Sequence, residues 1–219
     1  MTATRVQVLE EVARAVPHLA RPVLVGIDGV DGAGKTTFAD ALAANMGDRP
    51  VLRVSIDDFH HPRAVRHARG RQSPEGFWLD SFDYPAFRSR VLDPLASGGS
   101  GLVRLASHDL ASDAYVDPAP VAVPADAVVV VDGIFLQRPE LAAAWDLTVF
   151  LDVPFEVTLA RMVVRDGAPP GVDDPANARY VEAQRHYLAT CSPADRAGLV
   201  VDNSDPAHPV LRRQFPALS

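Results

Sequence analysis

The chain has 219 residues, 47% of them hydrophobic and 22% charged, which is typical of a soluble globular protein and sufficient for one large α/β domain. Its net charge of -7 argues against a general nucleic-acid-binding protein, because such proteins carry a basic excess. A single cysteine, Cys191, excludes an intrachain disulfide, and no apolar run has the length of a signal-peptide core or a membrane span, so we expect a cytoplasmic protein without a membrane partner.

The first half of the chain alternates between helix-like and strand-like patterns. Apolar spacing and turn residues predict, in chain order, a helix over 4–16, a buried strand over 21–29, a helix over 34–47, a buried strand over 51–56 and a helix over 81–97. Residues 59–80 show no clear period and contain four arginines, so a long loop is predicted there.

The second half continues the alternation. The same criteria predict a strand over 102–110, the most apolar strand over 127–133, a short helix over 138–145, a strand over 147–153, helices over 154–166 and 176–191, and a last strand within 197–206. One α/β domain spanning 1–219 is therefore predicted, with a five-stranded, mainly parallel sheet covered by helices on both faces. Ligands of such sheets bind beyond the carboxyl ends of the strands, where four aspartates are expected: Asp28, Asp57, Asp132 and Asp152.

A glycine-rich stretch, GVDGAGKTT at 29–37, satisfies the phosphate-binding pattern G-x-x-x-x-G-K-[ST] in full. Its glycines let backbone N–H groups approach phosphate oxygens, Lys35 would reach the outer phosphates, and Thr36 would offer its hydroxyl to Mg²⁺. Lys35 is the only lysine of the sequence, which suggests that the loop needs a compact ammonium rather than a planar guanidinium. The residues predicted to bind ATP are Gly29, Asp31, Gly32, Ala33, Gly34, Lys35, Thr36 and Thr37.

Asp132 ends the most apolar strand and is predicted to hold Mg²⁺ together with Thr36, directly or through water. The alternative for Asp132 is a structural aspartate in a strand-terminal turn. A phosphate loop alone does not name a reaction. The N-K-x-D motif of guanine-nucleotide switches is absent, since Lys35 is the only lysine, and motor or remodelling ATPases need larger modules. A small-molecule kinase that uses ATP fits the chain better.

Four further segments resemble the uridine/cytidine kinases and their phosphoribulokinase relatives, in the family's order and approximate spacing. They are SIDDFHHP at 55–62, SFDYPAF at 81–87, PADAVVVVDGIFL at 124–136 and VTLARMVVRD at 157–166. The resemblance implies an α/β P-loop NTPase fold, a three-layer sandwich with a small lid over approximately 161–180.

The resemblance also assigns roles to single residues. Asp57 matches the catalytic aspartate, and a carboxylate at a strand end can orient the acceptor hydroxyl and accept its proton. Asp83 matches the aspartate that binds ribose hydroxyls, although it also suits the N-cap of the following helix. Arg161 and Arg165, one turn apart, match lid arginines that clamp phosphates alongside Lys35; a solvated helix face is their alternative.

The expected acceptor site departs from the family pattern. His60 stands where the family usually has tyrosine, Tyr84 stands where it usually has histidine, and Phe82 suits either the acceptor site or the core. We expect these three residues to bind the substrate together with Asp57 and Asp83. A nucleoside such as uridine or cytidine is the acceptor that the resemblance implies.

Other interpretations stay open. The four arginines at 63–71 could bind an acceptor that is already phosphorylated, as in phosphoribulokinase-like enzymes, or form an exposed basic loop that balances acidic neighbours. A pantothenate-like acceptor is a further alternative. In a different class, the chain would be a nucleotide-binding regulatory module without a small acceptor. A homo-oligomer remains possible, because related kinases often assemble.

Overall fold

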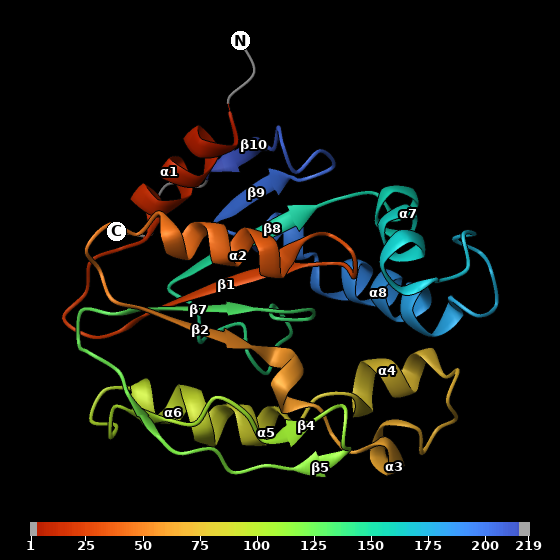
Figure 1. Ribbon diagram of the computed structural model, residues 1–219, viewed down its shortest axis with the longest axis horizontal. Helices are drawn as coiled ribbons and strands as arrows, with labels where there is room; N and C mark the ends of the chain where they lie inside the picture. The colour runs from red at the N-terminus through yellow and green to blue at the C-terminus, as the bar shows by residue number, and fades with distance from the viewer. Residues whose placement is uncertain (1–3, 215–219) are drawn as a thin grey trace.

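The computed structural model describes residues 4–214 and is built around a six-stranded sheet with the strand order β10-β9-β8-β1-β7-β2 (Figure 1). Five strands run parallel: β1 (Val23–Gly29), β2 (Val51–Ser55), β7 (Val128–Asp132), β8 (Leu147–Asp152) and β9 (Leu199–Asp202). The sixth, β10 (Val210–Gln214), pairs antiparallel with β9. The mainly parallel sheet is as predicted, but the predicted number of five strands is wrong, because β10 adds a sixth. This strand is short and carries two consecutive arginines, which break any apolar pattern.

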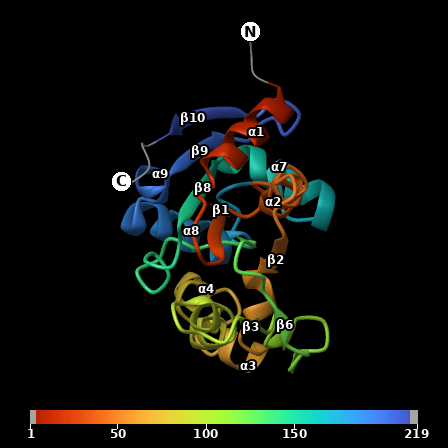
Figure 2. The ribbon, with the colours of Figure 1, turned by 90° about the vertical axis from the view of Figure 1, so that its left-hand side faces the viewer.

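The sheet separates two apolar layers, because successive residues of a strand point to opposite faces. Val130 of β7 packs with α1 (Arg5–Ala15) and α2 (Lys35–Ala44) on one face. The next residue, Val131, packs on the opposite face in a cluster that includes α8 (Ala178–Cys191). Figure 2 shows α2 and α8 on opposite sides of the sheet. Helices therefore cover both faces, as predicted.

The remaining elements are mostly short. The helices are η1 (Ile56–Phe59), α3 (Arg63–Arg66), α4 (Pro74–Asp80), α5 (Tyr84–Phe87), η2 (Arg88–Leu92), α6 (Asp93–Leu95), α7 (Phe155–Asp166) and α9 (Pro193–Arg196). Two small sheets pair β3 (Leu102–Val103) with β6 (Val121–Ala122) and β4 (His108–Asp109) with β5 (Ala114–Tyr115). The strand predicted over 102–110 is thus split between two small sheets, and the helix predicted over 138–145 is a series of turns. Within residues 4–214, no helix has the length and apolar character to cross a membrane.

Residues 59–80, predicted as a long loop, contain α3 and α4. Ser73 caps α4, because its hydroxyl accepts a hydrogen bond from the Gly76 N–H at 3.0 Å, and Pro74 supplies a φ suited to the first helical position. The prediction is wrong here because helices of four and seven residues are too short to show a 3.6-residue period.

The parallel strands bring their carboxyl ends to one edge of the sheet. Ile27 of β1 and Ser55 of β2 both pair with Asp132 of β7, so the segments that follow these three strands emerge side by side. The arrowheads of these strands point toward α7 and α8 in Figure 1. Ligands of open parallel α/β sheets bind at this edge.

Candidate functional site

The glycine-rich loop joins β1 to α2, and its path depends on two glycines. Gly32 and Gly34 have φ angles of 77° and 90°, in the left-handed region that side chains rarely adopt. A Cβ on Gly32 would lie 2.6 Å from the Thr158 carbonyl oxygen, and one on Gly34 would lie 2.9 Å from the Asn203 amide nitrogen. Gly34 is the N-cap of α2, so the loop directs the free backbone N–H groups of that helix toward the cleft.

Lys35 lies across this loop. Its ammonium donates a hydrogen bond to the Val30 carbonyl at 2.9 Å and lies 4.0 Å from the Asp31 carboxylate. Burial raises the pKa of Asp31, and the positive charge of Lys35 opposes that shift. An ammonium has three N–H donors, so Lys35 has donors left for an anion held in the loop.

Thr36 and Asp132 form an oxygen pair beside the loop. The Thr36 hydroxyl donates to Oδ2 of Asp132 at 2.6 Å. Arg53 of β2 donates to Oδ1 of Asp132 at 2.8 Å, and it also donates to the Val130 carbonyl at 2.8 Å and to Asp40 at 2.9 Å. Arg53 was not among the residues predicted for the site, although it is the one charged residue in the β2 strand.

The oxygen pair has the chemistry of a magnesium site. Hydroxyl and carboxylate oxygens are the ligands that Mg²⁺ prefers, and it usually takes few protein ligands together with phosphate oxygens. Across residues 4–214, no three His, Cys, Asp or Glu side chains are grouped so that they could hold a metal ion. A metal at this edge would therefore depend on Thr36, Asp132 and the oxygens of a bound phosphate.

Asp57 reaches the same cleft from the segment after β2. Ser55 caps η1 by accepting a hydrogen bond from the Asp57 N–H at 3.3 Å, which fixes the backbone of the aspartate. Desolvation by the cleft walls raises the pKa of the exposed Asp57 carboxyl, Lys35 opposes this shift, and the negative charge of Asp132 reinforces it. A raised pKa makes this carboxylate a better proton acceptor than an ordinary aspartate.

One cleft of about 370 Å³ brings most of the predicted nucleotide and catalytic residues together. The predicted residues that line it are Asp31, Gly32, Gly34, Lys35, Thr36, Thr37, Asp57, Asp132, Arg161 and Arg165. Residues that sequence analysis did not single out also line it: Arg5, Phe38, Gly133, Met162, Asn203 and Pro206. Gly29 and Ala33 belong to the same loop and are buried.

The two arginines predicted for the lid lie one turn apart on α7, but their surroundings differ. The Arg161 guanidinium donates to the Gly32 carbonyl at 3.0 Å and to the carbonyls of 203–204 at 2.8 and 2.9 Å, so it ties the loop to the segment after β9. Arg165 has a side chain that is 67% exposed, and it pairs with its neighbour Asp166 at 2.6 Å. Exposed ion pairs are weak, so Arg165, which already lines the cleft, can leave Asp166 for a bound phosphate at little cost.

Helix α8 holds the glycine-rich loop through two buried side chains. Gln184 accepts a hydrogen bond from the Asp31 N–H at 2.9 Å and donates one to the Asp31 carboxylate at 3.0 Å. Tyr187, one turn later, donates to the Asp28 carboxylate and accepts from the Gln137 N–H at 3.0 Å. Burial raises the pKa of Asp28, and its hydrogen bonds with Tyr187 and Gln137 oppose the shift. Asp28 was predicted at the sheet edge, but no local pattern in the sequence indicates these partners.

His60 contacts the backbone of Asp57 and does not line the cleft. Its Nδ1 donates a hydrogen bond to the Asp57 carbonyl at 2.7 Å, and its ring centre lies 4.3 Å from that of Phe82. Burial lowers the pKa of His60 to about 4, so the imidazole is neutral at neutral pH. His60 therefore fixes the backbone of the cleft carboxylate.

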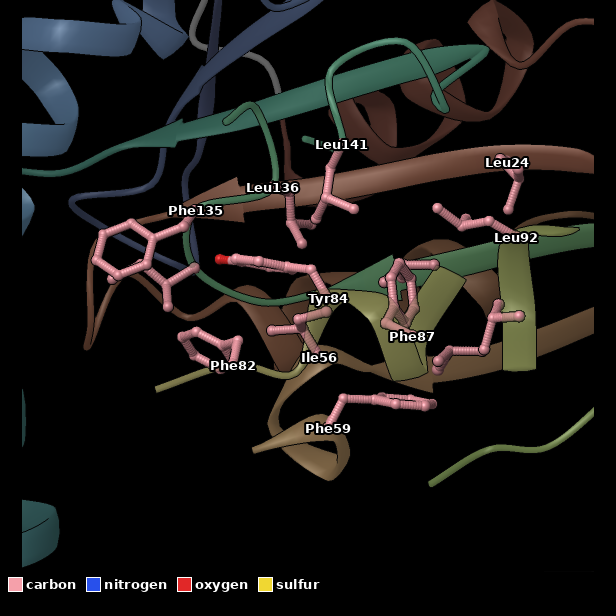
Figure 3. Close-up of a cluster of buried hydrophobic side chains, with 14 of the residues drawn as sticks. Leu24, Ile56, Phe59, Phe82, Tyr84, Phe87, Leu92, Phe135, Leu136 and Leu141 are labelled. Carbon is pink, nitrogen blue, oxygen red and sulfur yellow. The ribbon is translucent and has the colours of Figure 1, made fainter. Parts of the chain in front are cut away.

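The other predicted acceptor residues also lie outside the lining of the cleft. Oδ1 of Asp83 caps α5 by accepting from the Ala86 N–H at 2.9 Å, and Oδ2 lies 3.8 Å from His61. Phe82 and Tyr84 are buried among the apolar side chains that Figure 3 shows. The N-cap that sequence analysis offered as the alternative for Asp83 is thus present, and it leaves the second carboxylate oxygen outside the cap.

Arginines of the 63–71 segment are engaged with acidic neighbours. Arg66 lies 3.6 Å from Asp113, and Arg69 pairs with Asp80. These pairs correspond to the alternative in which the basic segment balances nearby acidic residues.

Both the sequence and the fold are similar to those of known proteins. The model of the phosphoribulokinase / uridine kinase family matches residues 24–201. The uridine kinase of Deinococcus deserti is 27% identical over 195 residues, which cover 87% of this chain and 92% of the relative. A solved structure described as a possible uridine kinase from Bacillus stearothermophilus has a TM-score of 0.70 at 25% identity, covering 90% of this chain and 96% of the other. A structure described as a candidate fructose transport system kinase from Silicibacter sp. TM1040 has a TM-score of 0.66 at 27% identity, covering 83% and 94%.

Gly32→Ala should prevent the loop from holding phosphate, because the added Cβ would meet a backbone oxygen at 2.6 Å. Gly47→Ala is the matched control: Gly47 also has a positive φ, of 63°, but no atom lies within 4 Å of an added Cβ. We expect Gly32→Ala to weaken binding of magnesium tripolyphosphate at least about tenfold, measured by isothermal titration calorimetry. Gly47→Ala should cost about 1 kcal/mol of stability and leave binding unchanged. Wild-type affinity in the Gly32 variant would contradict the assignment of the loop.

His60 should make the free energy of unfolding depend on pH. Its folded pKa of about 4 lies below its ordinary value of 6.5, so protons bind the unfolded chain more tightly. Stability is then fully present above pH 6.5 and decreases as the pH falls toward 4, by up to about 3 kcal/mol. His60→Phe keeps an aromatic ring beside Phe82 and should remove this part of the loss. Urea unfolding of both proteins at pH 7 and 4.5 measures the difference, and equal losses would refute the buried neutral imidazole.

Proposed function

The chain belongs to the phosphoribulokinase / uridine kinase family, and from this premise we propose that it transfers the γ-phosphoryl group of ATP to a hydroxyl of a small molecule. The proposal rests on one observation above all: the glycine-rich loop, the Thr36–Asp132 oxygen pair and the Asp57 carboxylate share a single cleft. Phosphoryl transfer needs a phosphate cradle, a metal site and a group that orients the nucleophile, and this cleft offers a residue for each.

The donor would bind along the loop after β1. Backbone N–H groups at the start of α2 and the Lys35 ammonium attract its phosphates. Thr36 and Asp132 would hold Mg²⁺, directly or through water, and the metal supplies neutralisation of the phosphate charge. Arg53 keeps the Asp132 carboxylate in its orientation through Oδ1. The proposed ATP-binding residues are Gly29, Asp31, Gly32, Ala33, Gly34, Lys35, Thr36 and Thr37.

In the proposed transfer, the acceptor hydroxyl oxygen attacks the γ-phosphorus in line. The bond from that phosphorus to the β,γ-bridging oxygen breaks, ADP leaves, and the hydroxyl proton passes to Asp57. Lys35, already beside the loop, neutralises charge on the phosphates, and Arg165 would turn in from α7 to join it. Arg161, which donates to the Gly32 carbonyl, contributes by holding the loop in its binding shape.

For the acceptor we propose a nucleoside of the uridine or cytidine kind. Proteins named as uridine kinases align over most of this chain, which supports that choice. Asp83 has one carboxylate oxygen outside its helix cap, and that oxygen can accept hydrogen bonds from ribose hydroxyls. The acceptor site would be supported by three buried side chains that do not line the cleft: His60, Phe82 and Tyr84.

A sugar or a sugar phosphate is the second candidate acceptor. The similarity to a candidate fructose transport system kinase favours it. A pantothenate-like acceptor and a regulatory module without an acceptor are the remaining alternatives. A regulatory module without an acceptor would give the Asp57 carboxylate no hydroxyl to deprotonate.

ADP release from magnesium ATP tests the proposal. Uridine, cytidine, fructose, ribulose 5-phosphate and pantothenate are offered in turn, with Lys35→Ala as the inactive control. We expect a pyrimidine nucleoside to stimulate ADP release by at least about a hundredfold over acceptor-free hydrolysis. Stimulation by a sugar or pantothenate would move the acceptor to another class and retain the kinase. Slow hydrolysis that no acceptor stimulates, but that a protein partner alters, would favour the regulatory module.

Asp57→Asn should lower turnover about a hundredfold or more while leaving ADP affinity close to that of the wild type, because the change removes the proton acceptor and spares the loop. Asp58→Asn, at the exposed neighbouring position, is the matched control and should stay near wild type. The raised pKa of Asp57 also predicts an acid limb in kcat/KM, with activity falling as the pH drops through that pKa. The limb should be missing in Asp57→Asn. Unchanged turnover in this variant would remove Asp57 from the mechanism.

A further inference from the structure

Arg5, the first residue of α1, lines the same cleft as the glycine-rich loop. Its guanidinium donates a hydrogen bond to the Pro206 carbonyl at 3.2 Å and a long one to the Thr37 carbonyl at 3.5 Å. A guanidinium has five N–H donors, and these two contacts use one donor each. Arg5 is therefore placed at the cleft with N–H donors left over.

The position of Arg5 is set by the packing of α1. Thr4 and Gln7 form a capping box at the start of this helix, with hydrogen bonds of 2.8 and 3.3 Å. Val8 and Val12, further along the same helix, are completely buried in the apolar layer shared with α2. The guanidinium thus comes from a docked helix.

Asp57, Asp132 and Arg165 line the cleft and are the residues proposed to act on the γ-phosphoryl group, so we call the part of the cleft beside them its transfer end. Thr37 follows Thr36 along α2, and Arg5 and Pro206 meet there through their hydrogen bonds. A nucleotide with its outer phosphate toward Asp57 must have its nucleoside part at the other end.

Three of the residues that line the cleft, Arg5, Asn203 and Pro206, lie outside the part of the chain that the family model matches. The match covers 24–201, whereas Arg5 precedes it, and Asn203 and Pro206 follow it. The phosphate loop, Asp57 and Asp132 all lie inside the match. Segments on both sides of the matched region therefore meet beside Thr37.

We propose that Arg5, together with the 203–206 segment, forms the nucleoside end of the donor site, with the planar guanidinium packed against the base of ATP. A guanidinium stacks well on aromatic faces, whereas a lysine ammonium is a point charge without a plane. This inference rests on the proposed function, because it takes ATP as the phosphoryl donor.

The test compares two magnesium-bound probes by isothermal titration calorimetry: ADP, which has a nucleoside, and tripolyphosphate, which has none. Arg5→Ala should weaken ADP binding about three- to tenfold and change tripolyphosphate binding less than twofold. Arg5→Lys, which keeps the charge but loses the plane, should weaken ADP binding to an intermediate extent. Arg14→Ala, in the last turn of the same helix and outside this cleft, is the matched control and should leave both affinities unchanged.

Several results would overturn the assignment. Unchanged ADP affinity in Arg5→Ala would show that the guanidinium does not contact the nucleotide. An equal loss for ADP and tripolyphosphate would show that Arg5 acts through charge on the phosphates. Urea unfolding of each variant shows whether a loss of ADP affinity comes from a loss of fold. If Arg5→Ala loses affinity only because it unfolds, while folded Arg5→Lys keeps full ADP affinity, the stacking role is also overturned. Acceptor-stimulated ADP release by the wild-type protein tests the proposed function separately. If no acceptor stimulates it, the proposed function fails; if an acceptor does and Arg5→Ala keeps its ADP affinity, the assignment of Arg5 alone fails.

Discussion

The glycine-rich loop keeps its shape because two helices from later in the chain, α7 and α8, hold it with hydrogen bonds. Left-handed backbone at Gly32 and Gly34 costs conformational freedom, so it persists where the surroundings determine it. Gln184 and Tyr187 of α8 bond to the loop and to the aspartate before it, and Arg161 of α7 bonds to the Gly32 carbonyl. The phosphate cradle is local in sequence, but its rigidity is a property of the whole fold.

The same division explains what could be predicted from sequence. Lys35 and Thr36 belong to a pattern with fixed spacing, and Asp132 ends an apolar strand, so local rules placed all three in one cleft. Arg53 bonds to Asp132 across 79 residues, and Gln184 bonds to Asp31 across 153, and no spacing rule reports such pairs. Partners that lie far away in the sequence therefore became known only from the structure, which shows the sheet register and the position of α8.

The burial of three residues predicted for the acceptor site could not be predicted from sequence for a different reason. His60, Phe82 and Tyr84 come from segments with short helices and turns, where no apolar period is long enough to separate core from surface. Each could be matched to a family position, but their burial depends on a cluster assembled from many elements. Asp83 has one carboxylate oxygen that caps α5 and another that lies outside the cap.

The spacing of Gln184 and Tyr187 on α8 also limits where insertions and deletions can be tolerated during evolution. An α-helix turns by about 100° for each residue, so one residue added between Gln184 and Tyr187 would swing one of them off the loop. The largely exposed 167–176 connection ahead of α8 is not helical, so an added residue there does not rotate one side chain relative to another about a helix axis. Insertions and deletions among descendants of this gene should therefore collect in that connection and spare the helix after it.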